Sequence, residues 1–439
     1  MSFKPTKLFI KYAFPNMIST AFISFYFIID TIFVGQMIGT KALGAMGLTM
    51  PFIMISFALI DMIAVGSSVQ IALRLGSGRF KQACGIFSFS LITVFIFACF
   101  VFLFGFFFIE PISNYLIDDK ELAVLAAQYA KVFALFCPVI MLCFMLDNYL
   151  RICKKPIYSM CVNIFVAFIN IVLDYIFIVI LEWGLFSAAL ATCIGLSLGT
   201  LLGFAPFVFG NLELKLSKAF INLKIIKNII YNGSSEFLTN ISTSLFVIAA
   251  NALLLDIAGV RGVAILEVIF AIDSFMASLI FSMCDGMQPL LSYYYGAKNI
   301  KFIMALFWRT FFGAIALGVM IVVAISFGSD FIVSFFSRDI EFIAASKEAL
   351  LVFSPVYLCS WFIIFANSFF TALNRPAYSL SISLSANLLL PLPFLYILTN
   401  FLEVNGVWLT PFAAKFCVVW LALYFLRETI KKLNLNFLS

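Results

Sequence analysis

The sequence KPIYS at residues 155–159 returns as RPAYS at residues 375–379. Pro376 follows Pro156 by almost half the length of this chain of 439 residues. A motif that repeats at half the chain length indicates two copies of one structural unit. The sequence therefore predicts a duplicated fold, with one copy in each half.

Further pairs agree with this repeat. Asp339 follows Asp119 by the same separation, and Cys137-Pro138 is echoed by Ser354-Pro355 at a slightly shorter one. The two copies therefore extend well beyond one short motif, and each covers about half of the sequence.

The composition shows which solvent surrounds these copies. Hydrophobic residues make up 64% of the chain and charged residues 11%, whereas soluble globular proteins have about 45–50% apolar and about 25% charged residues. The sequence therefore excludes an ordinary soluble protein and indicates helices in a lipid bilayer. A spanning helix needs about 20 apolar residues, so this chain has room for about a dozen.

Twelve apolar runs are bounded by charges or by Gly and Pro. They fall at about 8–34, 44–73, 84–109, 124–150, 157–181, 185–209, 227–255, 262–295, 302–328, 346–372, 377–400 and 406–427. Six spans separate the repeats, and six is even, so both halves have the same orientation and form a parallel repeat. We expect an all-α polytopic membrane protein with an N-terminal lobe at 1–210, a cytoplasmic linker at 211–226 and a C-terminal lobe at 227–439.

Basic residues predict the orientation in the membrane. Twenty of the 27 lie in the N-terminal segment, the even-numbered loops and the C-terminal tail. The opposite face has six, namely Lys41, Lys120, Lys131, Arg261, Arg338 and Lys347. By the positive-inside rule both termini are cytoplasmic, and acidic loops such as Asp118-Asp119 face outward. We interpret the first apolar run as an uncleaved span and expect a monomer in the plasma (inner) membrane of a bacterium.

The presence of each acidic residue inside a span requires an explanation, because a charge in lipid costs several kcal/mol. Eight remain after the loops are assigned: Asp30, Asp61, Asp147, Asp174, Glu236, Glu267, Asp273 and Asp285. Asp147 precedes Arg151 by four residues, which predicts an ion pair on one helix face. Glu267 and Asp285 lie near span ends, where water can reach them.

Asp30 and Asp174 are placed at matching depth. At 1.5 Å per residue, both lie about 27 to 29 Å from the cytoplasmic ends of their spans. Asn170 lies one turn from Asp174 on the same face, and Thr192 lies about 12 Å below the outer boundary on the next span, which descends from Gly184. Two close carboxylates in a low dielectric favour uptake of a proton, and with the Asn and Thr oxygens they also suit Na⁺. The alternative is that Asn170 and Asp174 only cap or join helices.

The second half offers a different group of intramembrane charges. Glu236 lies about 13 Å from the inner end of its span, Asp273 about 18 Å from the outer end of its own, and Lys415 about 13 Å below Gly406. An ion or substrate site is one interpretation. A salt bridge between the lobes that only fixes packing is the other, and the sequence does not separate them.

The sequence lacks motifs that are typical of enzymes and nucleotide-binding proteins. It has no histidine, no Walker A loop and no GxGxxG, so it offers no Ser-His or Cys-His dyad and no nucleotide-binding motif. We expect no enzyme, no cofactor and no nucleic-acid partner. Twinned halves also argue against a receptor that does not transport.

Several stretches resemble the multidrug and toxic compound extrusion (MATE) family of secondary transporters. They are Asp30-Thr-Ile-Phe-Val-Gly35, Gly76 to Lys81, Lys155-Pro156 through Asn170-Ile-Val-Leu-Asp174, Gly184-Leu-Phe-Ser-Ala-Ala-Leu-Ala-Thr192, and Gly286-Met-Gln288-Pro289 through Ala297. The resemblance implies two six-helix lobes in a V around a central cavity, and export of cationic or amphipathic organic compounds against Na⁺ or H⁺. It also implies that Asp30, Asn170, Asp174 and Thr192 form a cation site in the first lobe.

The chain departs from one branch of this family, in which the tenth span carries an acid. Residues 346–372 have Glu348 only at the outer edge, so a second-lobe ion site would depend on Glu236. The alternative function is a flippase for a lipid-linked or anionic precursor, which predicts a cavity rich in Arg and Lys. Eight intramembrane acids against Lys415 favour cations. Neither the substrate nor the choice between Na⁺ and H⁺ can be read from the sequence.

Overall fold

The structure is a computed structural model, and it describes residues 5–117, 119–210, 212–219, 222–336 and 339–435. The predictions for Asp118 and Arg338, and those for parts of the linker and both termini, lie outside these residues. Helices account for almost all of the described chain, and no strand occurs among them. The predicted all-α fold is therefore confirmed.

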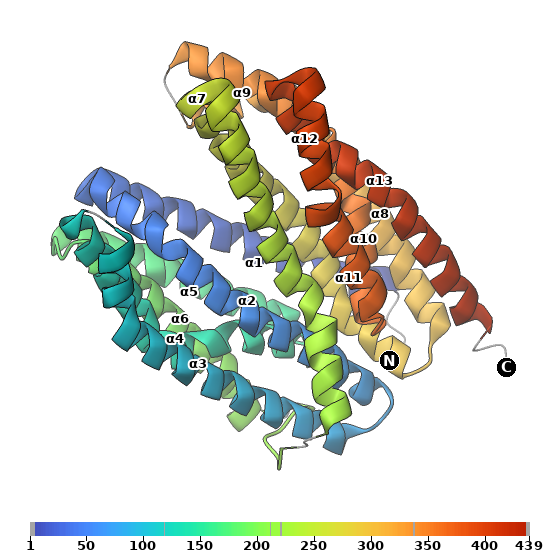
Figure 1. The fold of residues 1–439 in the computed structure, drawn as a ribbon. Helices are drawn as coiled ribbons and strands as arrows, with labels where there is room; N and C mark the ends of the chain where they lie inside the picture. Colours follow the sequence, from blue (N-terminus) through green and yellow to red (C-terminus); the bar gives the residue numbers. More distant parts are fainter. Residues whose placement is uncertain (1–4, 118, 211, 220–221, 337–338, 436–439) are drawn as a thin grey trace. The chain divides into compact units, whose positions relative to one another are not determined.

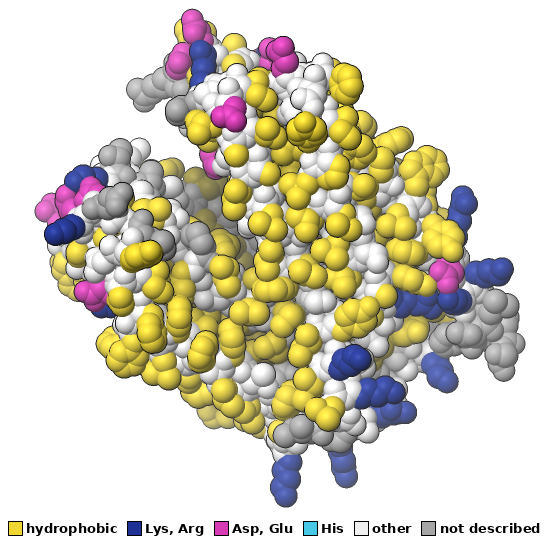
Figure 2. Space-filling view, in the orientation of Figure 1, with side chains coloured by type: hydrophobic (Ala, Val, Ile, Leu, Met, Phe, Trp, Pro, Cys, Tyr) yellow, Lys and Arg dark blue, Asp and Glu magenta, His cyan; other side chains and the backbone are white. Residues whose placement is uncertain are grey.

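Within the described residues, the twelve predicted spans correspond to eleven long apolar helices and one bent pair, and Figure 1 shows the helices in chain order. The bent pair is α9 (Ile340–Phe353) and α10 (Val356–Ala372), which meet at 50°. Pro355 stands at the break and, because it lacks an N–H, it cannot continue the helical hydrogen bonding. Hydrophobic side chains cover the middle of the helices and charged ones gather at helix ends (Figure 2), as expected for helices that cross a bilayer.

The chain divides into two compact units. One unit runs from Ile18 to Gly233 and contains most of α1 (Pro5–Phe33). Its other elements are η1 (Val34–Ile38), α2 (Thr40–Gly76), α3 (Phe80–Leu116), α4 (Lys120–Ile152), α5 (Pro156–Asp174), η2 (Tyr175–Ile180) and α6 (Leu185–Phe209). We call this the first unit. Within it α4 packs against α2, α3 and α6.

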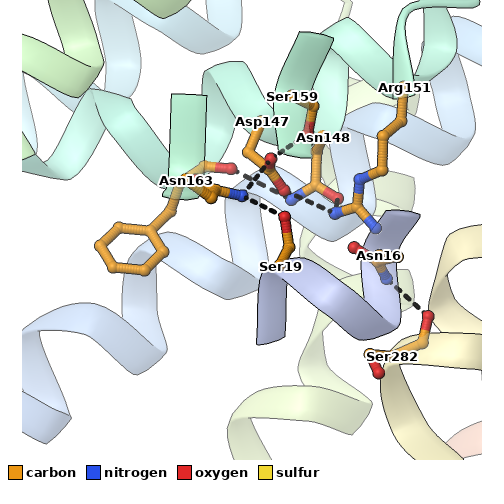
Figure 3. Close-up of polar contacts among 9 residues, drawn as sticks. Asn16, Ser19, Asp147, Asn148, Arg151, Ser159, Asn163 and Ser282 are labelled. Atoms are coloured by element: carbon orange, nitrogen blue, oxygen red, sulfur yellow. Dashed lines mark hydrogen bonds and ion pairs between the residues drawn. The ribbon is translucent and has the colours of Figure 1, made fainter. Parts of the chain in front are cut away.

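The second unit begins at Ser234 and also includes the described residues 5–17. Its elements are most of α7 (Leu223–Gly296), α8 (Ile300–Ser334), α9, α10, α11 (Pro376–Leu384), η3 (Ser385–Leu389), α12 (Pro391–Leu402) and α13 (Val404–Leu435). Gly259, with φ of +63°, divides α7 into two spans, because glycine adopts this conformation at little cost. Here Asn16 donates a hydrogen bond of 2.5 Å to the carbonyl of Ser282 (Figure 3).

Each unit therefore includes a short helical segment from the other half of the sequence. The start of α1 packs with second-half helices, and the start of α7, up to Gly233, packs with first-half helices. A Cβ atom at Gly66 on α2 would lie 2.0 Å from the carbonyl oxygen of Ile229 on α7. Glycine is therefore needed for this close approach. The predicted lobe boundaries at residues 210 and 227 stay a prediction.

The sequence repeat reappears as a repeat of local structure. The Asp119 carboxylate caps α4 by accepting hydrogen bonds from the backbone N–H groups of Glu121 and Leu122, and the Asp339 carboxylate caps α9 by accepting from the N–H of Glu341. Lys154 and Asn374, which have the same separation along the chain, both have positive φ, at 65° and 55°. These corresponding turns precede α5 and α11, so both copies enter the next helix through the same backbone geometry.

Candidate functional site

Two acidic residues stand where an α-helix changes into a π-helix. Asp30 lies in the last turn of α1, which continues as η1, and Asp174 is the last residue of α5, which continues as η2. The two π-helices contact each other, and both contact α6. π-Helical turns are uncommon and often occur at functional sites. The first unit therefore brings these two helix ends together beside the start of α6.

The four residues predicted for the first lobe are all buried. Asp30 is 3% exposed, Asp174 0%, Asn170 1% and Thr192 5%. Asp174 lies close enough to Asp30 for their charges to interact. The side-chain amide of Asn170 donates a hydrogen bond of 3.0 Å to the hydroxyl of Thr192. The structure thus places all four in one buried region of the first unit.

Several oxygens of this group have no hydrogen-bond partner among the described residues. They are Oδ1 of Asp30, Oδ1 of Asn170 and both carboxylate oxygens of Asp174. A buried polar atom left unpaired costs about 1–3 kcal/mol, and more when it is charged. These oxygens therefore need a proton, a cation or ordered water. The donor set consists of hard oxygens, which suits a proton or a small hard cation.

Two tyrosines belong to the same region and were not predicted. Tyr26 and Tyr129 are 3% and 2% exposed, and each interacts electrostatically with both Asp30 and Asp174. Tyr26 lies one helical turn before Asp30, so helical periodicity could have predicted that Tyr26 belongs to this group. Tyr129 comes from α4, and nothing in the sequence connects it with the other helices.

Asp147 takes part in a separate cluster of the first unit (Figure 3). Its carboxylate lies 3.1 Å from the Arg151 guanidinium, so the predicted ion pair is confirmed. It also accepts hydrogen bonds from the hydroxyl of Ser159 and, at 2.9 Å, from the amide of Asn163. Asn163 extends the cluster to Ser19 on α1 at 3.1 Å. Asp147 is therefore fully engaged in joining helices.

Of the three residues predicted for a second-lobe site, the structure brings two together. Asp273 on α7 and Lys415 on α13 line one cavity of the second unit. Glu236 is half-buried elsewhere on α7 and does not line this cavity. Glu267, which we expected to face water, is exposed. Among the described residues no three His, Cys, Asp or Glu side chains gather into a metal site.

Comparison with known proteins gives a family match in both halves of the chain. The sequence matches the MatE family over residues 15–176 and 237–397, one stretch in each half. It is 26% identical to the multidrug export protein MepA of Staphylococcus aureus (strain MSSA476) over 298 residues, 67% of this chain and 65% of MepA. The MepA of Staphylococcus saprophyticus is 26% identical over 286 residues, 64% of this chain and 63% of that protein. The match thus spans less than two thirds of these curated relatives.

Solved structures show the same fold at lower sequence identity. A MATE protein crystallised in complex with MaL6 has a TM-score of 0.93 and 22% identity, with 98% of each chain covered. A MOP superfamily transporter from Pyrococcus furiosus has a TM-score of 0.92 and 22% identity, covering 98% of this chain and 97% of that one. The expected two-lobe fold and the resemblance to MATE transporters are confirmed. The two matched stretches span most of the sequence, and the chain therefore belongs to the MatE family.

Proposed function

We propose that this integral membrane protein is a cation-coupled antiporter that exports cationic or amphipathic organic compounds by alternating access. The observation that carries the proposal is the set of unpaired, buried oxygens on Asp30, Asn170 and Asp174. A site of this kind gains free energy when a proton or Na⁺ fills it. The coupling ion is therefore H⁺ or Na⁺, and the oxygen donors accept both.

The mechanism follows from what these side chains do when the ion binds and leaves. Without the ion, the carboxylates of Asp30 and Asp174 repel each other in a low dielectric. Binding a cation removes that repulsion and draws the ends of α1 and α5 together. An ion that stabilises one arrangement of these helix ends more than the other shifts the balance between inward- and outward-facing states.

The substrate class is supported by two arguments. MepA of Staphylococcus aureus, one relative with a matching sequence, is named as a multidrug export protein. After the loop and span-end charges are set aside, eight acids remain within the predicted spans, with Lys415 as the one base, so the field within the protein favours cations. A flippase for an anionic precursor would need a cavity lined by several bases, whereas Lys415 is the single base that lines the second-unit cavity among the described residues.

Efflux of a fluorescent organic cation from everted membrane vesicles tests the proposal. We expect energised vesicles to accumulate the cation, and we expect the double variant Asp30→Asn, Asp174→Asn to lose this activity. Glu267→Gln is the matched control, because it removes one exposed acid from a span and should leave transport unchanged. Undiminished ion-driven transport in a well-expressed double variant would overturn the proposal.

A further inference from the structure

The second unit contains a cavity of about 80 Å³ whose ligand the proposed ion coupling at Asp30 and Asp174 does not specify. It lies between α7, α9, η3, α12 and α13. Its lining residues are Thr243, Phe246, Phe270, Asp273, Phe353, Ala386, Asn387, Pro391, Pro411 and Lys415. Thr243 is exposed, and Asp273 and Lys415 are half-buried. Three phenylalanines form apolar walls beside the polar groups.

The acid and the base in this cavity are close but do not form a direct ion pair. Their charges interact, yet among the described residues no contact of 4.0 Å or less joins them. Oδ1 of Asp273 is buried without a hydrogen-bond partner. The ammonium of Lys415 donates one hydrogen bond, 3.0 Å long, to the hydroxyl of Ser360. An ammonium has three donors, so this site has both an anionic and a cationic group available.

Two neutral polar side chains lie near the two charged residues. The buried hydroxyl of Tyr357 on α10 lies beside Asp273. Asn387 also lines the cavity, and its amide nitrogen donates to the carbonyl of Ser383 at 3.0 Å, which leaves its own carbonyl oxygen available to a ligand. The cavity therefore has neutral hydrogen-bonding groups beside its two charged residues.

The charge balance decides which ligand suits this cavity. A simple cation is attracted by Asp273 but repelled by Lys415. A simple anion is attracted by Lys415 but repelled by Asp273. A ligand that has an ammonium and a carboxylate gains from both residues at once. We infer that the second-unit cavity binds the charged end of a small zwitterion, with its apolar part against Phe246, Phe270 and Phe353.

Three compounds with one phenyl group test this inference by equilibrium dialysis against the purified full-length protein in detergent. Phenylalanine is the zwitterion, 2-phenylethylamine lacks the carboxylate, and 3-phenylpropionate lacks the ammonium. We expect phenylalanine to bind at least about tenfold more tightly than either single-charge compound, as losing one charge-assisted contact implies. Equal or weaker binding of phenylalanine would overturn the inference.

Two variants separate recognition by charge from general damage. Lys415→Met should weaken phenylalanine binding and strengthen that of 2-phenylethylamine, because a repelling charge is lost. Asp273→Asn should weaken phenylalanine and strengthen 3-phenylpropionate. A parallel loss for all three compounds would contradict the inference. If either variant does not give a monodisperse protein, the three-compound comparison on the unaltered protein still decides.

This inference is independent of ion coupling. The double variant Asp30→Asn, Asp174→Asn changes only the first unit, so it should bind phenylalanine as the unaltered protein does. Failure of ion-driven export with retained zwitterion binding would therefore contradict the antiport proposal alone. The reverse result would contradict the zwitterion site alone.

Discussion

Ser379 donates a hydrogen bond of 2.5 Å to the side-chain oxygen of Asn367, and this contact joins α11 to α10. Its counterpart lies at the equivalent position of the first copy, where Ser159 donates to Asp147 and joins α5 to α4. The repeat therefore preserves a helix-joining contact while the residue type changes from an acid to an amide. The acid of the first copy is balanced by Arg151.

The ion pair of this first-copy contact gives a stability prediction. Asp147→Asn retains an acceptor for Ser159 but leaves the Arg151 guanidinium, which is 5% exposed, without its 3.1 Å carboxylate. Removing one partner of a buried pair costs about 3–5 kcal/mol. We expect a clear fall in the melting temperature of the purified protein in detergent, and partial recovery when Arg151→Gln is added. An unchanged melting temperature would contradict the structural role of the pair.

The close approach of α2 and α7 in the first unit gives a second prediction. Gly66→Ala places a methyl group 2.0 Å from the Ile229 carbonyl oxygen, so the helices must separate. Overpacking of this kind costs about 1–3 kcal/mol. Gly47→Ala on the same helix is the control, since a Cβ there has nothing within 4 Å. Thermal unfolding in detergent should rank Gly66→Ala below Gly47→Ala, and the opposite order would contradict this packing.

Thr192 provides a test of the first-unit site that leaves both acids in place. Thr192→Val removes the hydroxyl that accepts a hydrogen bond of 3.0 Å from the amide of Asn170, whereas Thr192→Ser keeps it. A lost hydrogen bond of about 1–1.5 kcal/mol corresponds to roughly tenfold in an equilibrium constant. We expect the ion concentration for half-maximal transport to rise by up to about tenfold in the valine variant and little in the serine variant. Equal values for both variants would show that the hydroxyl has no part in ion binding.

The cap of α4 gives a prediction about pH. Hydrogen bonds from the backbone N–H groups of Leu122 and Glu121, together with the nearby Lys41 ammonium, hold the pKa of Asp119 below its usual range. The stability that the cap contributes is therefore complete above the ordinary Asp pKa of about 4, and it is lost as pH falls through the lowered value. Asp119→Ala should reduce amide protection in the first turn of α4 at neutral pH. The difference in amide protection between this variant and the unaltered protein should vanish in strong acid. A difference that stays constant with pH would contradict the role of the Asp119 carboxylate as a cap.

The fold was predictable because lipid imposes simple rules on a sequence. Continuous apolar runs and the repeat from Pro156 to Pro376 were enough to predict the spans and the two-lobe fold. The assignment of the start of α1 and the start of α7 to the opposite units was not predictable, because it depends on three-dimensional packing such as Gly66 against Ile229.

The site was predictable only where helical spacing connects residues along one element. Asp30 and Asp174 share a depth, and Asn170 lies one turn from Asp174, so periodicity brought them together. Tyr129 lies on another helix without a spacing signal. In the second half, depth alone grouped Glu236 with Asp273 and Lys415, because it gives the height of a residue but not the direction in which its helix faces.

The proposal that Asp30 and Asp174 bind the ion that drives export is decided by transport in proteoliposomes. An imposed Na⁺ gradient and an imposed pH gradient are applied separately, with an organic cation as the cargo. We predict that one of the two gradients drives movement of the cation by the unaltered protein, and that the same gradient drives none in the Asp30→Asn, Asp174→Asn variant. Equal gradient-driven transport by the two proteins, or no response of the unaltered protein to either gradient, would contradict the proposal.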